Sequence, residues 1–137
     1  MRGQSRSHFT DEQWAAAREQ ATRFLQERAG APDPLNMTYY EEVCQNITAT
    51  EFDPDSNALA ELLGEISTAE YRAGRGMLSA IVIHKPGEQS DERPGRGFGE
   101  CARSLRLPTR DLEALWITQM NVVHNYWRRA LAGQGAM

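Results

Sequence analysis

Three side chains near the middle of the sequence have the chemistry of a general acid–base site. Glu65 supplies a carboxyl group, and His84 and Lys85 supply an imidazole and an amine at the end of an apolar segment. Beside a glycine-rich loop such as 95–97, these groups could transfer protons or cleave a phosphodiester. A small hydrolase or nuclease that uses these three residues is therefore one function that the sequence allows.

The same residues also have simpler structural explanations. Glu65 would form a salt bridge with Arg72 or Arg75, and His84 and Lys85 would be the polar end of a strand. The sequence contains no HExxH, CxxC or paired-aspartate spacing, and neither a nucleophile elbow nor a Walker A motif. We therefore expect no metal and no cofactor, and the sequence does not decide whether the chain is an enzyme.

The formal net charge of −4 is unevenly distributed along the chain. Residues 1–65 hold five arginines and twelve acidic residues, a net charge of −7. Residues 66–110 hold eight basic and five acidic residues, a net charge of +3, and residues 111–137 balance. Such asymmetry can guide an anionic ligand to one part of a protein whose net charge is negative.

The basic middle segment predicts the preferred function, which is a small binding module. Fourteen of the fifteen basic residues are arginine, and arginine binds phosphate and carboxylate groups through paired hydrogen bonds. We expect the module to contact nucleic acid or another anionic partner, with an affinity that falls as the salt concentration rises. The candidate nucleic-acid-binding residues are Arg72, Arg75, Lys85, Arg93 and Arg96.

A third function class is a protein-binding adaptor or inhibitor, for which the acidic first half of the chain would be the contact surface. Near the C-terminus, Trp116, Tyr126 and Trp127 are spaced i, i+10 and i+11, as on one helix. They would pack against the core or form a homodimer, because interfaces are rich in aromatic residues.

His124 lies beside these three aromatic residues, and we expect it to be a hydrogen-bonded histidine rather than a ligand.

Composition places the chain among ordinary globular proteins. The 137 residues are 40% hydrophobic and 25% charged, which excludes a disordered tail, a collagen-like repeat and a disulfide scaffold. No apolar stretch approaches 18 residues and no secretory signal follows the N-terminus, so we expect a cytoplasmic protein without a membrane partner. Cys44 and Cys101 lie on the apolar faces of expected helices, where they would be free, buried thiols.

Capping signals and apolar spacing predict about five helices. Thr10 and Gln13 form a capping box, with Phe9 and Trp14 as its hydrophobic staple. A glycine inside the third helix, Gly64, would allow the close approach of another backbone. The expected helices are 11–29, 38–47 beginning with a Thr38–Glu41 capping box, 56–73 capped by Ser56 or Asp55, 98–105, and a last helix capped by Thr109.

Residues 77–84 are apolar and rich in β-branched side chains, and they form the one strong strand that the sequence predicts. Its partner would be residues 93–99, residues 48–52 or a second protomer. We therefore predict a single α+β domain over 1–137, mostly helical with a minimal β-sheet, and a winged-helix-like topology in which 93–98 returns from the wing. Residues 1–36 would be added to a core of 37–132, and residues 133–137 would fray.

Four short motifs lie in the middle of the chain: Leu62-Leu63-Gly64-Glu65-Ile66, Gly74-Arg75-x-Met77-Leu78-Ser79, His84-Lys85 and Pro94-Gly95-x-Gly97-Phe98. Through these motifs, residues 38–106 resemble an uncharacterised family of small bacterial proteins. The family pattern has a second aromatic residue where this chain has Gly99. The resemblance implies no catalytic residues, but for such a small chain we expect a role in regulation or host–phage conflict.

Overall fold

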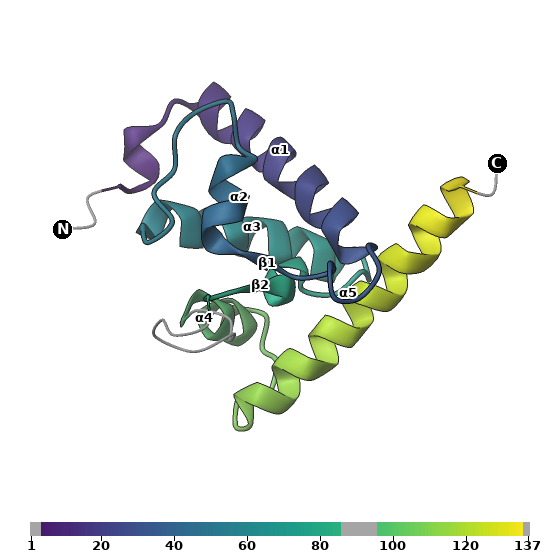
Figure 1. Ribbon diagram of the computed structural model, residues 1–137. Helices are drawn as coiled ribbons and strands as arrows, with labels where there is room; N and C mark the ends of the chain where they lie inside the picture. Colours follow the sequence, from purple (N-terminus) through teal and green to yellow (C-terminus); the bar gives the residue numbers. More distant parts are fainter. Residues whose placement is uncertain (1–3, 86–95, 136–137) are drawn as a thin grey trace.

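The fold is mostly helical, and the computed structural model describes residues 4–85 and 96–135 (Figure 1). Helix α3 lies between α1 and α4, and α5 packs across the C-terminal end of α1. The elements in chain order are η1 (Arg6–His8), α1 (Asp11–Ala29), β1 (Thr38–Tyr39), α2 (Tyr40–Gln45), α3 (Asn57–Arg72), η2 (Leu78–Ile81), β2 (Val82–Ile83), α4 (Arg96–Ser104) and α5 (Leu112–Gly135).

The α+β class with a minimal sheet is confirmed, since two short strands pair in parallel. Thr38 lies opposite Val82, and Tyr39 lies opposite Ile83. β2 pairs with residues 38–39, which were not among the partners expected from the sequence, and the expected partner 48–52 is wrong because those residues form no strand. The returning strand expected over 93–98 is also wrong from residue 96 onward, where α4 begins, and residues 93–95 lie outside the described part of the chain.

The start of α1 confirms the predicted capping box and staple. The Gln13 backbone N–H donates to Thr10 Oγ1 at 3.0 Å, and the Thr10 N–H donates to Gln13 Oε1 at 2.9 Å. The rings of Phe9 and Trp14 lie 5.7 Å apart, and Phe52 stacks on Phe9 at 4.5 Å. This aromatic group fixes the loop that precedes α3 against the first turn of α1.

Helix caps elsewhere agree only partly with the sequence. Ser56 caps α3, because its Oγ accepts from the Leu59 N–H at 3.1 Å. The expected cap of the last helix at Thr109 is wrong, since α5 begins at Leu112 and Asp111 Oδ1 accepts from the Ala114 N–H at 3.0 Å. Carboxylates cap helices well because they face the positive end of the helix dipole.

Thr38 does not begin a helix, so its expected capping box with Glu41 is wrong. It lies in β1, and its hydroxyl donates to Glu42 Oε1 at 2.7 Å. Arg28 at the end of α1 donates to both carboxylate oxygens of Glu42, at 3.1 and 3.3 Å. Burial alone would raise the pKa of Glu42, but these hydrogen bonds and the Arg28 charge lower it below its usual value.

The predicted strand at 77–84 is wrong over most of its length. Residues 78–81 form the short helix η2, and only residues 82–83 are a strand. Side chains of neighbouring helices satisfy the backbone here: the Ser79 N–H donates to Ser67 Oγ at 2.8 Å, and the Ala80 carbonyl accepts from Trp116 Nε1 at 2.8 Å. The apolar residues at 77–84 therefore indicate that the segment is buried. They do not distinguish a short helix from a strand, because either can be buried on all sides.

Two clusters of buried side chains form the core. The larger one joins α1, α3 and η2, and the smaller one joins the start of η2 to α4 and α5. Residues 1–36, which were expected to be an addition to a core of 37–132, contribute directly to the larger cluster. Five residues of α1 belong to it: Trp14, Ala17, Ala21, Leu25 and Ala29. No helix in the described ranges is both long enough and apolar enough to cross a membrane.

The close backbone approach expected at Gly64 is wrong, because a Cβ there would meet nothing within 4 Å. Gly76 is a position that does require glycine. Its φ is +88°, and a Cβ would lie 2.9 Å from Val122 Cγ1 and 3.0 Å from Val123 Cγ2. Gly76 thus lets the turn after α3 pass directly against α5.

These two glycines predict opposite effects of the same substitution. Gly76→Ala should lower the free energy of unfolding by about 1–3 kcal/mol, because the methyl group collides with α5 and the backbone stays left-handed. Gly64→Ala should raise it by about 0.5–1 kcal/mol, because alanine favours the helix and the space is open. Urea denaturation of both variants measures the two changes, and equal effects would contradict this packing.

Candidate functional site

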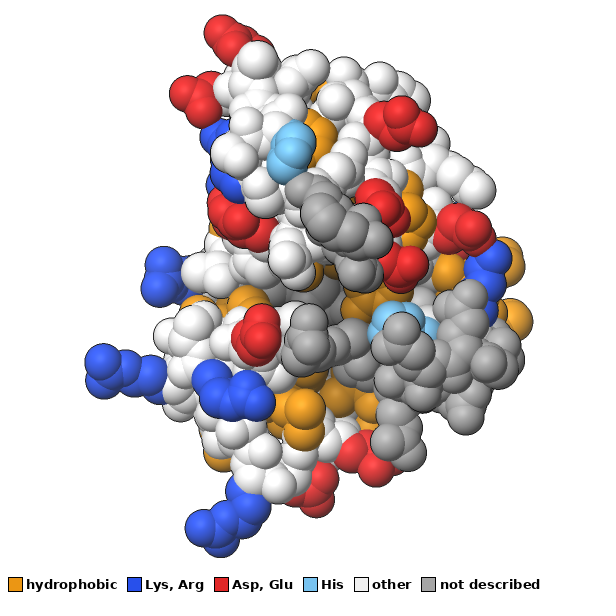
Figure 2. Space-filling view, turned by 90° about the vertical axis from the view of Figure 1, so that its left-hand side faces the viewer, with side chains coloured by type: hydrophobic (Ala, Val, Ile, Leu, Met, Phe, Trp, Pro, Cys, Tyr) orange, Lys and Arg blue, Asp and Glu red, His pale blue; other side chains and the backbone are white. Residues whose placement is uncertain are grey.

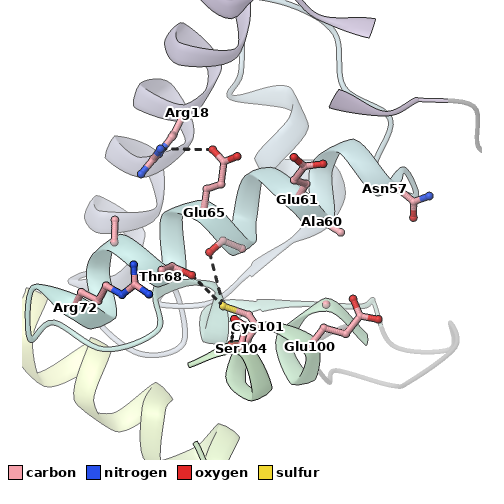
Figure 3. Close-up of a pocket in the computed structure, with 13 residues that line it drawn as sticks. Arg18, Asn57, Ala60, Glu61, Glu65, Thr68, Arg72, Glu100, Cys101 and Ser104 are labelled. Carbon is pink, nitrogen blue, oxygen red and sulfur yellow. Dashed lines mark hydrogen bonds and ion pairs between the residues drawn. The ribbon is translucent and has the colours of Figure 1, made fainter. Parts of the chain in front are cut away.

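Glu65 lies apart from the other two residues of the expected acid–base site. Glu65 lines the groove between α3 and α4, and its carboxylate points toward α1, where it accepts from Trp14 Nε1 at 2.9 Å. Arg18 is its ion-pair partner, at 3.5 Å, so the expected salt bridge of Glu65 with Arg72 or Arg75 is wrong. Two donors from α1, Trp14 and Arg18, therefore hold this carboxylate in place, and Figure 3 shows the contact with Arg18.

His84 and Lys85 line a different and smaller cavity of about 120 Å³, beside the end of β2. The His84 ring lies 4.9 Å from the Tyr40 ring, and the Lys85 amine pairs with the Glu41 carboxylate. Glu65 does not line this cavity. The structure therefore does not bring Glu65, His84 and Lys85 into one site, and we do not retain the hydrolase alternative.

Arg75, a candidate for nucleic-acid binding, is engaged inside the fold. Its Nε and Nη2 donate to the two carboxylate oxygens of Glu70, at 3.0 and 2.8 Å, and its guanidinium lies 5.9 Å from the Trp127 ring. The hydrogen bonds with Glu70 raise the pKa of Arg75 despite its partial burial. Glu70 is buried and also accepts from Gln26 Nε2 at 3.1 Å. Arg75 is therefore a structural residue.

The other four candidates for nucleic-acid binding are in different situations. Lys85 is paired with Glu41, as described above. Arg72 is exposed at the end of α3, and no described residue forms a hydrogen bond or ion pair with it. Arg93 and the side chain of Arg96 lie outside the described residues. The structure therefore brings these candidates together in no common patch within the part that it describes.

Exposed arginines that the sequence analysis did not single out lie at the end of α4 and in the turn that follows it: Arg103, Arg106 and Arg110. Figure 2 shows basic side chains along the left edge of the lower half of one face, while acidic side chains predominate in the upper half. The positive net charge of residues 66–110 was the sequence feature that could have identified these three arginines, because they contribute to it.

Breaking the Glu70–Arg75 pair should cost much more stability than removing an exposed arginine. Arg75→Ala should lower the free energy of unfolding by about 3 kcal/mol, because it leaves a buried carboxylate with a single neutral donor. Arg72→Ala should change it by less than about 0.5 kcal/mol. Chemical denaturation of the two variants tests this difference, and a stable Arg75→Ala protein would show that the pair is not structural.

Residues of α3 and α4 line an open groove with a volume of about 720 Å³ (Figure 3). Glu61, Glu65, Thr68 and Arg72 follow the helical spacing i, i+4, i+7 and i+11, so they share the outer face of α3. The opposite face carries the large buried side chains of the core. Helix α4 and Arg18 from α1 complete the walls.

The floor of the groove is made of small side chains. Ala60 and Gly64 come from α3, and Gly97 comes from α4, where a Cβ would lie 3.6 Å from the Ala60 Cβ. The backbones are thus close at one end, while the space over Gly64 stays empty. None of the lining residues is aromatic, and most are polar or charged.

Cys101 also lies on this floor, but its chemistry is not that of a nucleophile. Its thiol donates to the Gly64 carbonyl at 3.7 Å and lies 3.6 Å from Thr68 Oγ1. Burial raises the pKa of Cys101, with a smaller opposing effect of Thr68, so the thiolate that nucleophilic attack requires is disfavoured. Burial and three nearby carboxylates raise the pKa of Cys44 to about 12. Both cysteines are free, as expected.

The C-terminal aromatic residues have different environments. Trp116 and Trp127 are partly buried against the two core clusters, and Trp116 donates a hydrogen bond to η2. Tyr126 is 41% exposed. His124 is buried, with Nε2 at 2.9 Å from the Asn36 carbonyl oxygen, which confirms the hydrogen-bonded histidine that the sequence predicts.

The burial of His124 predicts an acid-sensitive contribution to stability. Burial lowers the pKa of His124 below its usual 6.5, as does the charge of Arg128, against the raising effects of Asn36 and Asp33. Protons therefore bind the unfolded chain more tightly, so this contribution is complete above pH 6.5 and decreases as the pH falls below that value.

His124→Gln should remove part of this sensitivity, because the glutamine amide can still donate to the Asn36 carbonyl but does not titrate. The loss of unfolding free energy between pH 7 and pH 5 should be smaller in the variant than in the unsubstituted protein. Urea denaturation at both values measures the loss, and an equal loss would contradict the assignment of a neutral His124 to the folded state.

In the part of the chain that the structure describes, no three His, Cys, Asp or Glu side chains are grouped so that they could hold a metal ion. The sequence matches no family model, and neither a curated protein nor a solved structure matches it.

Proposed function

We propose that this chain is a small binding module that holds a polypeptide segment of a partner protein in the groove between α3 and α4. The observation that carries the proposal is the groove itself, which has an empty floor over Gly64 and charged side chains on its walls. Two of its carboxylates, Glu61 and Glu65, belong to the acidic first half of the chain. The proposal therefore specifies the adaptor alternative of the sequence analysis.

Groove chemistry favours a polypeptide over a small cofactor-like molecule. The volume of about 720 Å³ falls within the usual range of ligand pockets. Such pockets are lined mainly by hydrophobic and aromatic side chains, whereas the apolar lining here consists of alanine, glycine and cysteine. Small floor residues and a polar rim suit a backbone that approaches closely while its side chains reach the charged walls.

Nucleic acid is less well supported as the partner of this groove. Glu61, Glu65 and Glu100 line it, and carboxylates repel phosphate. Arg75 and Lys85, on which the sequence-based proposal partly depended, are paired with glutamates. The exposed arginines Arg103, Arg106 and Arg110 are the surface through which nucleic acid would bind instead. Self-association of the chain through Tyr126 is a separate alternative, and analytical ultracentrifugation would detect such a homodimer.

A library of short random peptides displayed on cells tests the proposal, with the purified protein as bait. Peptides selected on the unsubstituted protein should lose at least about tenfold in affinity for Gly64→Leu, whose side chain fills the groove. Gly133→Leu is the matched control, since a Cβ at Gly133 also meets nothing within 4 Å and Gly133 lies outside the groove, in the last turns of α5. Fluorescence anisotropy measures each affinity, and thermal melting confirms that both variants fold.

Two results would overturn the proposal. One is that no peptide is selected, or that selected peptides bind Gly64→Leu as tightly as the unsubstituted protein. The other is salt-dependent binding of a random DNA duplex that is lost when Arg103, Arg106 and Arg110 are replaced by alanine, which would assign the function to nucleic acid.

A further inference from the structure

We infer that the segment held in the groove is bipolar, with a basic side chain at the Glu61 end and an acidic group at the Arg72 end. The inference rests on the proposed function and adds the chemistry of the partner. Figure 3 shows Glu61 and Glu100 toward one end of the groove and Arg72 at the other. The groove is therefore not uniformly acidic but reverses its charge along α3.

The geometry of α3 fixes the distance between the two charges. Glu61 and Arg72 are eleven residues apart on a continuous helix, which corresponds to about 16 Å along its axis at 1.5 Å per residue. Eleven residues also complete about three turns, so both side chains lie on the same face. A partner segment would span this distance with about five extended residues or about three helical turns.

The middle of the groove contributes little unbalanced charge. Glu65 lies between the two ends, where Arg18 and the Trp14 indole already bind its carboxylate. The end groups differ from it, because no described residue forms a hydrogen bond or ion pair with Glu61 or Arg72, and both are exposed. A ligand can therefore bind these two charges without displacing a contact within the described fold.

Another effect would explain the same arrangement without a ligand. An acidic residue in the first half of a helix and a basic residue in its last turn complement the helix dipole. That effect acts on stability alone, and it predicts that reversing the two charges leaves peptide recognition unchanged. Measuring both the peptide affinity and the stability of the charge-reversed protein therefore distinguishes the bipolar partner from the helix-dipole effect.

The test is the double charge reversal Glu61→Arg with Arg72→Glu, which keeps the net charge of the chain. Peptides selected on the unsubstituted protein should lose at least about tenfold in affinity for this variant. The same peptides with their basic and acidic residues exchanged should bind the variant more tightly than the unsubstituted protein. Glu113→Arg with Arg129→Glu is the matched control, because it reverses an acidic and a basic residue on α5, away from the groove, and should change neither affinity.

Binding of the selected peptides with equal affinity to the charge-reversed and unsubstituted proteins would overturn the inference. If Gly64→Leu still abolishes that binding, the proposed function stands and only the bipolar partner is rejected. If Gly64→Leu has no effect either, the groove is not the binding site and the proposed function fails as well.

Discussion

The buried carboxylate of Glu70 is the group on which the arrangement of the long helices depends. Arg75 binds both of its oxygens from the turn after α3, and Gln26 binds one of them from α1. The same arginine lies over the Trp127 ring of α5. A buried carboxylate is stable only while such partners remain, because its transfer out of water is otherwise costly. One ion pair therefore connects three helices and directs the chain from α3 toward η2.

This connection also determines which side chains of the basic segment remain available for binding. Arg75 turns inward to Glu70, whereas Arg72, three residues earlier, stays exposed on the outer face of α3. The inner face of that helix supplies large core side chains, and its outer face supplies the charges and the bare floor of the groove. One helix thus joins the core to the proposed binding surface, so that the charges at the groove ends are held at a fixed separation.

Some local signals in the sequence predict the structure correctly, although those at Thr38 and Thr109 do not, and features that depend on distant neighbours were not predictable. The Thr10–Gln13 capping box and the cap at Ser56 are encoded within four residues, and both were predictable. The segment at 77–84 was assigned to a strand because its backbone partners, among them Ser67 and Trp116, are side chains distant in sequence. The groove was not predictable for the same reason: Gly64 indicates helix packing when read alone, and its empty space appears only once α4 is placed.

Amide chemical-shift mapping by NMR tests most directly whether ligands bind between α3 and α4. A selected peptide titrated into the isotope-labelled protein should perturb amides of residues 60–72 and 97–104 most strongly. Perturbations confined to the turn at 105–111 or to the C-terminal half of α5 would contradict binding between α3 and α4. They would show that the peptide binds elsewhere on the protein and leaves the groove empty.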